Sequence, residues 1–321
     1  MNLSNVSADS FLHVTLFLQD KDSMSVIFIC KHFYELRSRY GLKDYVSSKH
    51  LESAIHAKFR VVHVQLAASY SLKLPDSVKH VRLDPRRHPP IELPLHLFPQ
   101  FIETLLIGFN HNQRIEPRTL PNTITTLSLG VRFNQPLEPY ALPACLTSLR
   151  FCCDFNQEIR PGTFPVTLTD LELGFCFNRL LKKGVFPSEL KCLKFGYMFN
   201  QIISTDVLPD SLTDLTFGAH FNSSLEDFVL PKNLERLTFG DYFNHPLSSQ
   251  TLPKTLSYLS VASAFMQPLT FEILPPSLTK LVFDLVSNPF HMGDHRLSVR
   301  RAQLVKLSLA SRTSLAVVIN S

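Results

Sequence analysis

The sequence lacks several features that common protein classes require. Tryptophan is absent, and 10 glycines stand against 22 prolines and 26 phenylalanines in 321 residues. No stretch reaches 18 consecutive apolar residues, and residues 1–10 carry no lysine or arginine ahead of an apolar stretch. We therefore expect neither a membrane span nor a secretory signal. The chain is 45% apolar and only 18% charged, which excludes a disordered chain because a large core can form.

Neither the cysteines nor the charged residues indicate a metal site or a nucleic-acid-binding site. The six cysteines follow no metal-binding spacing, so we expect reduced thiols in a cytosolic or nuclear protein; they are Cys30, Cys145, Cys152, Cys153, Cys176 and Cys192. The net charge of +5 is small and has no long basic run, which does not favour nucleic acid as a partner. Nucleophile-elbow, phosphate-binding and H-E-x-x-H motifs are missing, so we expect no enzyme, no cofactor and no metal.

What the sequence does contain is a period of 22 residues. Nine prolines stand 22 residues apart, each after Leu or Phe: Pro99, Pro121, Pro143, Pro165, Pro187, Pro209, Pro231, Pro253 and Pro275. Six residues past each proline lies a leucine, from Leu105 to Leu281. Nine past is Gly in six units, twelve past is Phe in seven, and thirteen past is Asn in eight. A period of this length is typical of a solenoid built from identical turns.

Each column predicts a structural role. The segment L-x-L/F-G alternates inward and outward residues, which indicates a short strand. Strands repeated every 22 residues must stack in parallel, with the leucine column as the spine of the core. We expect the Asn to lie at an inward corner and to bond backbone groups of the next turn. The Gly is expected to allow a tight backbone after the strand. The Pro is expected to fix an extended, mostly non-helical return segment.

This pattern resembles known repeats. The unit L-P-x-x-L-x-x-L-x-F-G-x-x-F-N-x-x-L, clearest over residues 208–225, resembles the leucine-rich repeat. Its F-N-x-x-L/I segments, such as FNQPL at 133–137 and FNHPL at 243–247, resemble the FNIP repeat family of amoebae and of the giant viruses that infect them. The resemblance covers residues 72–291 and implies a leucine-rich-repeat-like solenoid with a parallel sheet of short strands. Residues 292–321 are then expected to cap its C-terminal end.

The pattern before Pro75 is helical. The arrangement L-F-L-x-D-x-D, an aliphatic stretch and then C-K-H-F-Y-E-L resembles an F-box over residues 7–44. The prediction is thus a small all-α module, followed by a helical linker or N-terminal cap over residues 45–71. The resemblance implies that this module binds a Skp-type adaptor of a cullin–RING ubiquitin ligase. By the same resemblance, the adaptor-binding residues are Phe11, Leu12, Leu16, Leu18, Ile27, Phe33 and Leu36.

The outward positions of the strands, and those just past them, predict a second contact surface. These positions vary from turn to turn while the core columns stay constant, and they mix charged and aromatic side chains as protein interfaces do. We expect a target protein on this concave face, bound by Arg150, Asp170, Glu172, Lys194, Tyr197, Asp214, His220, Arg236, Tyr242 and Tyr258.

These surfaces together predict the substrate-recognition subunit of a cullin–RING ligase, acting in the cytoplasm or nucleus, of a host cell if the source is viral. Two alternatives stay open. One is a repeat scaffold that binds a protein partner without recruiting a ligase, since Ser10-Phe11-Leu12 stands where an F-box usually opens with Leu-Pro. The other is a metal-dependent or hydrolytic enzyme that uses Cys153, Cys176 and Cys192. Neither nucleic acid nor a membrane is expected as a partner.

Overall fold

The computed structural model describes residues 25–27, 63–66, 79–83, 98–107, 111–225, 230–262, 264–284 and 315–320. The chain divides into two compact units. The first unit comprises residues 1–135 and 140–146, and the second unit comprises residues 136–139 and 147–321. Within the described residues the regular structure is entirely strand and turn.

In the part of the first unit that the structure describes there are five strands. They are β1 (Ser25–Ile27), β2 (His63–Leu66), β3 (His80–Leu83), β4 (Thr104–Leu106) and β5 (Thr126–Leu129). Strand β1 pairs with β2 in antiparallel fashion, and β2 to β5 pair in parallel. The partners Thr104 and Thr126 in β4 and β5 lie 22 residues apart, which matches the period of the sequence.

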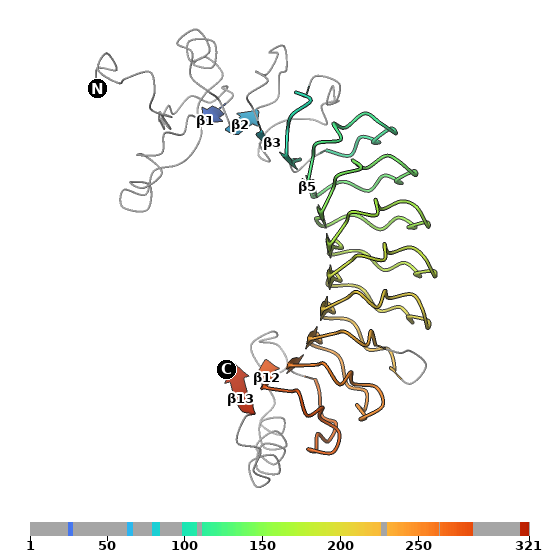
Figure 1. The fold of residues 1–321 in the computed structure, drawn as a ribbon, viewed down its shortest axis with the longest axis vertical. Helices are drawn as coiled ribbons and strands as arrows, with labels where there is room; N and C mark the ends of the chain where they lie inside the picture. Colours follow the sequence, from blue (N-terminus) through green and yellow to red (C-terminus); the bar gives the residue numbers. More distant parts are fainter. Residues whose placement is uncertain are drawn as a thin grey trace, which may run out of the picture. The chain divides into compact units, whose positions relative to one another are not determined.

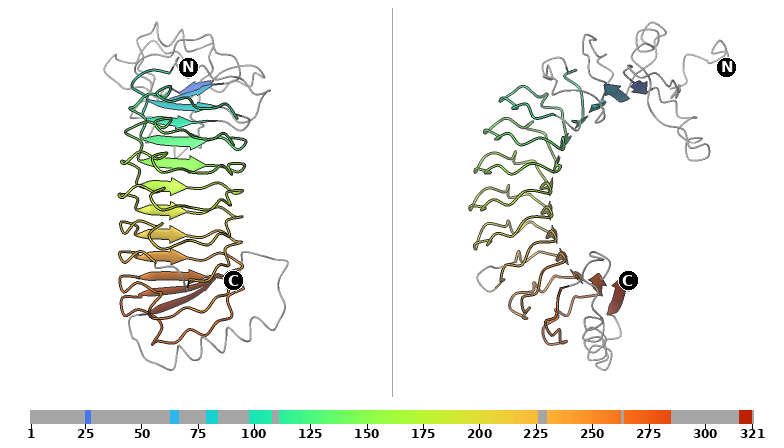
Figure 2. Two further views of the ribbon diagram at one scale, coloured as in Figure 1. Left: turned by 90° about the vertical axis from the view of Figure 1, so that its right-hand side faces the viewer. Right: turned by 180° about the vertical axis from the view of Figure 1, so that it is seen from behind.

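Among its described residues the second unit has eight strands, and successive strands run parallel (Figure 2). They are β6 (Ser148–Phe151), β7 (Asp170–Glu172), β8 (Cys192–Lys194), β9 (Asp214–Thr216), β10 (Arg236–Thr238), β11 (Tyr258–Val261), β12 (Lys280–Asp284) and β13 (Ala316–Asn320). The predicted parallel stack is therefore confirmed. Strand β13 pairs with β12 at the C-terminal end, so residues of the predicted C-terminal cap extend the sheet.

The leucine column forms the spine of the core, as predicted. Within each unit, the leucines of neighbouring strands pair with one another, as Leu171 does with Leu193. All nine are at most 2% exposed: Leu105, Leu127, Leu149, Leu171, Leu193, Leu215, Leu237, Leu259 and Leu281. Burying such a side chain contributes about 2 kcal/mol. The column thus favours one register, because a slip of one residue would expose it.

Stacked phenylalanine rings make the second unit curve. Parallel strands lie about 4.8 Å apart. Further from the strands, Phe195 and Phe217 have centroids 5.5 Å apart, and Phe177 and Phe199 are 6.1 Å apart. On the return side, Phe164 and Phe186 are 6.5 Å apart. Because successive turns diverge away from the sheet, the strands lie on the inner side of the curve of this unit (Figure 1).

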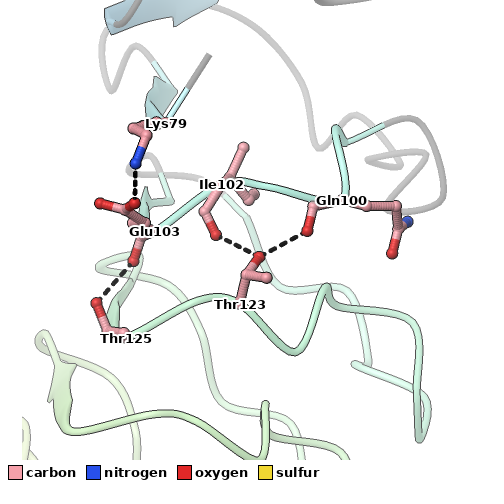
Figure 3. Close-up of polar contacts among 6 residues, drawn as sticks. All are labelled: Lys79, Gln100, Ile102, Glu103, Thr123 and Thr125. Atoms are coloured by element: carbon pink, nitrogen blue, oxygen red, sulfur yellow. Dashed lines mark hydrogen bonds and ion pairs between the residues drawn. The ribbon is translucent and has the colours of Figure 1, made fainter. Parts of the chain in front are cut away.

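Hydroxyl groups join successive turns outside the strands. In the first unit the Thr123 hydroxyl oxygen lies 2.7 Å from the carbonyl oxygens of Gln100 and of Ile102 (Figure 3). The Thr125 hydroxyl donates to the Glu103 carbonyl at 3.2 Å, and Lys79 pairs with the Glu103 carboxylate. The hydrogen bond from Lys79 lowers the pKa of Glu103. These contacts supply partners to carbonyl groups at the edge of each turn.

The asparagine column forms the predicted ladder between turns. The Oδ1 atom of one Asn accepts the backbone N–H of its equivalent in the next turn, for example from Asn200 to Asn178 at 3.0 Å and from Asn222 to Asn200 at 2.9 Å. Met266, which breaks the pattern, still donates its N–H to Asn244 at 2.8 Å. The inward position was wrong, because these side chains are half-buried or exposed, while the preceding Phe is buried.

The glycine column has a different cause from the one predicted. A Cβ added to Gly218 would lie 1.8 Å from the carbonyl oxygen of Gly196 in the turn before, and Gly196 relates to Gly174 in the same way. The side chain is therefore excluded by the close approach of two backbones. The left-handed conformation occurs elsewhere in the turn, at Gly162 and Gly184.

The proline also acts differently from the prediction. Its carbonyl accepts the N–H of the residue three positions later in every described turn, for example from Leu212 to Pro209 at 3.2 Å. Each Pro therefore opens a tight turn that leads into the strand, where we predicted an extended segment.

The N-terminal helical module was predicted over residues that the structure describes only in part. Ser25–Ile27 and His63–Leu66 are strands, so the helical prediction is wrong for these residues. Val26, Ile27 and Val64 are β-branched and pair with a neighbouring strand, which favours extended backbone over helix. The rest of residues 7–44 and 45–71 lies outside the described residues.

His111 interrupts the phenylalanine column of the first unit. It stands twelve residues past Pro99, where seven later turns have Phe, and it is 7% exposed. Its Nε2 atom is buried without a hydrogen-bond partner. Burial lowers the pKa of His111 from 6.5 to about 4, because the charged form would lose its hydration.

The glycine column yields a first prediction. We expect Gly218→Ala to lower the free energy of unfolding by more than Gly184→Ala does. At Gly184 there is open space for a methyl group, so only the left-handed φ is unfavourable, and the substitution costs about 1 kcal/mol. Urea unfolding of both variants measures the difference. Equal destabilisation would contradict the close approach of the turns.

His111 yields a pH prediction. The unfolded chain binds a proton at this residue below about pH 6.5 and the folded chain only below about pH 4, so stability falls as pH decreases across this window, by about 3 kcal/mol in total. We expect His111→Phe to remove this loss and to fill the Phe column. Urea unfolding at pH 7.5 and at pH 4.5 tests it. If His111→Phe raised the free energy of unfolding by the same amount at both pH values, the buried neutral imidazole would be contradicted.

Candidate functional site

The candidate site is the outward side of strands β6 to β12 in the second unit, here called the strand face. The alternation of the strand pattern buries the leucine of each strand and turns the residues on either side of it outward. The strand face consists of Arg150, Asp170, Glu172, Cys192, Lys194, Asp214, Arg236, Tyr258 and Lys280. Seven of these residues belong to the predicted target-binding set, and the structure brings them together on adjacent strands.

Charged side chains on the strand face pair across neighbouring strands. Glu172 forms ion pairs with Arg150 on one side and Lys194 on the other, both at 3.5 Å. Arg236 Nε lies 3.1 Å from Asp214 Oδ1. All five side chains remain at least 31% exposed, so these pairs add little to stability. Their charges are oriented and accessible to a partner.

Cys192 lies between two carboxylates. The register places it beside Asp170 in β7 and Asp214 in β9, and its thiol is hydrogen-bonded to Asp170. Burial raises the pKa of the Cys192 thiol to about 11, and the two carboxylates contribute in the same direction. A thiol of this kind is protonated at neutral pH, which makes it a poor nucleophile or metal ligand.

Tyr258 lies between two cations. It pairs with Arg236 in β10 and with Lys280 in β12. The guanidinium carbon of Arg236 is 4.5 Å from the ring centroid, and Lys280 Nζ is 5.6 Å from it. Both distances are within the range of cation–π attraction. This end of the strand face therefore carries two positive charges around one aromatic ring.

A row of aromatic rings in mutual contact follows the ends of strands β7 to β10, and we call it the aromatic ladder. It consists of Phe175, Tyr197, His220 and Tyr242. Successive ring centroids are 4.6, 4.9 and 4.9 Å apart; the first pair is stacked, the second is tilted, and the third meets edge to face. Phe175 is 47% and Tyr197 37% exposed. Rings that contact one another in this way form a continuous amphipathic strip.

Sequence reasoning found part of this surface. Tyr197, His220 and Tyr242 were predicted as contact residues, and the contacts among their rings were not. Phe175 and Lys280 were missed. Phe175 stands directly after Gly174 and outside the two Phe columns of the core. An extra Phe outside the core columns was the signal that could have identified it. Lys280 stands at the same outward offset as Tyr258, one turn later.

The predicted adaptor-binding residues cannot be placed in the same way. Phe11, Leu12, Leu16, Leu18, Phe33 and Leu36 lie outside the described residues. Ile27 falls in strand β1. The role of this set stays a prediction.

Other kinds of site were sought in the described part of the chain. No group of three or more His, Cys, Asp or Glu side chains there is arranged to hold a metal ion. Among the same residues, no helix has the length and apolar character that crossing a bilayer requires. The predicted thiol cluster separates, because Cys192 is on the strand face while Cys153 and Cys176 follow strands β6 and β7.

The environment of Cys192 gives a testable prediction. Replacing both Asp170 and Asp214 by Asn removes the two carboxylates that raise its pKa, and each unit of pKa recovered raises the thiolate fraction about tenfold. We expect faster alkylation of Cys192 by iodoacetamide at pH 8, measured by mass spectrometry of peptides. The exposed Cys145, in the first unit, serves as the internal control. An unchanged rate at Cys192 would contradict the effect of the carboxylates.

Comparison with known proteins places the chain in a family. FNIP repeats match residues 92–132, 109–154, 133–176, 177–220 and 221–263, which together span 172 of the 321 residues. The crystal structure of CroV588, described as a novel circular LRR protein structure, is 35% identical with a TM-score of 0.64. The match covers 77% of this chain and 34% of the CroV588 chain, so this chain spans about a third of that protein's length. No curated protein matches the chain significantly. With its FNIP repeats matched over more than half of its length, the chain belongs to the FNIP repeat family.

Proposed function

We propose that the chain is a non-enzymatic protein-interaction scaffold that binds a partner protein on the strand face of its second unit. The observation that supports the proposal is the contrast between the two sides of each strand. The inward leucines are uniform and buried, whereas the outward residues differ from turn to turn and most of them remain accessible, with Ser260 and Val282 as buried exceptions. Selection for folding alone does not require such variety on one face, and repeat proteins use such faces for binding.

The finer proposal is that this scaffold selects substrates for a cullin–RING ubiquitin ligase. Its support is the sequence pattern of residues 7–44, in which Cys30-Lys31-His32-Phe33-Tyr34-Glu35-Leu36 follows an aliphatic stretch as in an F-box. The module would bind a Skp-type adaptor, and the strand face would hold the target in the cytoplasm or nucleus. The scaffold without ligase recruitment is the alternative, supported by the missing Leu-Pro at the start of the module.

The two readings predict different complexes. We expect the tagged full-length chain, expressed in a eukaryotic cell, to co-purify with adaptor and cullin subunits identified by mass spectrometry. The double variant Leu16→Asp and Phe33→Ala should lower their recovery about tenfold or more, since central apolar contacts dominate such interfaces. The target proteins should be retained because the strand face is unchanged.

Two control variants complete the experiment. Leu180→Asp replaces an exposed leucine, 62% accessible and away from the strand face, and should leave all partners bound. Lys194→Glu should reduce the recovery of targets while the adaptor remains. If the full chain recovers targets and no ligase subunit, the scaffold alternative holds. If no strand-face variant changes any partner, the proposed binding surface is wrong.

A further inference from the structure

Charge on the strand face is unevenly distributed along the stack. Strands β7 and β9 carry the acidic residues Asp170, Glu172 and Asp214. Strands β10 and β12 carry Arg236 and Lys280, on either side of Tyr258. Arg150 and Lys194 pair with Glu172, so on β6 to β9 the three carboxylates outnumber the cations by one, whereas toward β12 the strand face becomes basic.

The basic end has charge that the described residues do not neutralise. Arg236 pairs with Asp214, but within the described part of the chain Lys280 has no carboxylate partner, and its contact is with the Tyr258 ring. Two cations around one ring repel each other. An incoming carboxylate near Tyr258 would relieve this repulsion and accept a charge-assisted hydrogen bond from Lys280.

The aromatic ladder lies at the other ends of the strands from these cations. It begins at Phe175, just past β7, and ends at Tyr242, past β10, whereas Arg236, Tyr258 and Lys280 are the first residues of their strands. A chain that crosses the turns obliquely, from the strand ends at β7 to the strand start at β12, would therefore contact both the exposed aromatic strip and the basic end. At about 4.8 Å per strand, this path extends about 24 Å along the stack, so it needs more than about seven residues of extended peptide.

We propose that the strand face binds an extended segment of a partner protein that places a large apolar side chain on the aromatic ladder and a carboxylate beside Lys280 and Tyr258. This inference rests on the proposed function and specifies the chemistry of the partner. Charge complementarity selects an acidic segment at the basic end, and the ladder supplies apolar contact area with hydroxyl and imidazole groups at its edge.

The same charges disfavour a nucleic acid. Aromatic rings beside cations are also found where single-stranded nucleic acids bind. A strand of RNA, however, would bring phosphate groups along its whole length past Asp170, Glu172 and Asp214. A peptide with its acidic residue at one end avoids this repulsion, since its remaining backbone is neutral.

Selection from a peptide display library tests the proposal. The library has random peptides of about twelve residues, longer than the path across the strand face, and the full-length chain is immobilised. We expect enriched peptides to combine Asp or Glu with Phe, Tyr, Leu or Met a few residues away. A fluorescent copy of the top peptide should bind Lys280→Glu about tenfold more weakly than the wild type and bind Lys280→Arg nearly unchanged. Tyr197→Ser should weaken it too, and added salt should weaken it further.

The matched control is Lys254→Glu, which makes the same change of charge at an exposed residue before β11. It should leave the affinity unaltered, and circular dichroism should show all variants folded. Enrichment of basic or uncharged peptides, no enrichment at all, or stronger binding of single-stranded RNA overturns the inference. If basic or uncharged peptides are enriched and their binding depends on Arg150 or Lys194, the strand face is still the binding surface and only the acidic character of the partner is wrong. If no strand-face substitution affects them, both proposals fall.

Discussion

The close approach of one turn's backbone to the next is the constraint on which the rest of this structure depends. At the ends of strands β7 to β10 the chain passes so near the preceding turn that a Cβ at Gly196 or Gly218 would lie 1.8 Å from a carbonyl oxygen. A 22-residue turn must therefore repeat with little variation. Once it does, every side-chain column stacks on itself, because each residue lies directly beside its equivalent.

Each column of equivalent side chains then stabilises the fold in a different way. Buried leucines pair along the sheet, and rings such as Phe195 and Phe199, with centroids 4.0 Å apart, fill the space behind it. Hydroxyl and amide side chains bond the backbone of the neighbouring turn, so polar groups at the edges have partners. With folding assigned to the inward columns, the outward residues are free to differ. The surface proposed for binding therefore exists because the interior is so regular.

Much of this arrangement can be predicted from the sequence, because a repeat multiplies a weak signal. The leucine column, the parallel register and the bonds made by Asn178 and Asn200 follow from position alone. The cause of the glycine column cannot be read in this way, since a one-residue motif does not reveal whether φ or a neighbouring backbone excludes the side chain. The turn opened by Pro209 was likewise hidden, because a fixed φ suits both extended chain and turns.

The structure was hardest to predict before the repeats begin and at residues that do not occupy the repeated positions. Ser25–Ile27 pairs with His63–Leu66, and no period links these segments, so their helix-like spacing was misleading. The stacking of Phe175 on Tyr197 depends on two turns that place the ring at the same offset, and the next ring, His220, is shifted by one residue. Such contacts depend on side-chain directions, which sequence spacing alone does not give.

The asparagine ladder has a direction. In each described bond the acceptor amide belongs to the earlier turn and the donating N–H to the later one, as between Asn156 and Asn178. During synthesis the N-terminal turns leave the ribosome first. Each new turn can therefore pack on a preceding turn that already presents its Asn acceptor oxygen, an unpaired strand edge and the exposed face of its Phe ring. The solenoid can grow vectorially, one turn at a time on a finished template, so that the chain never has to search for long-range partners all at once.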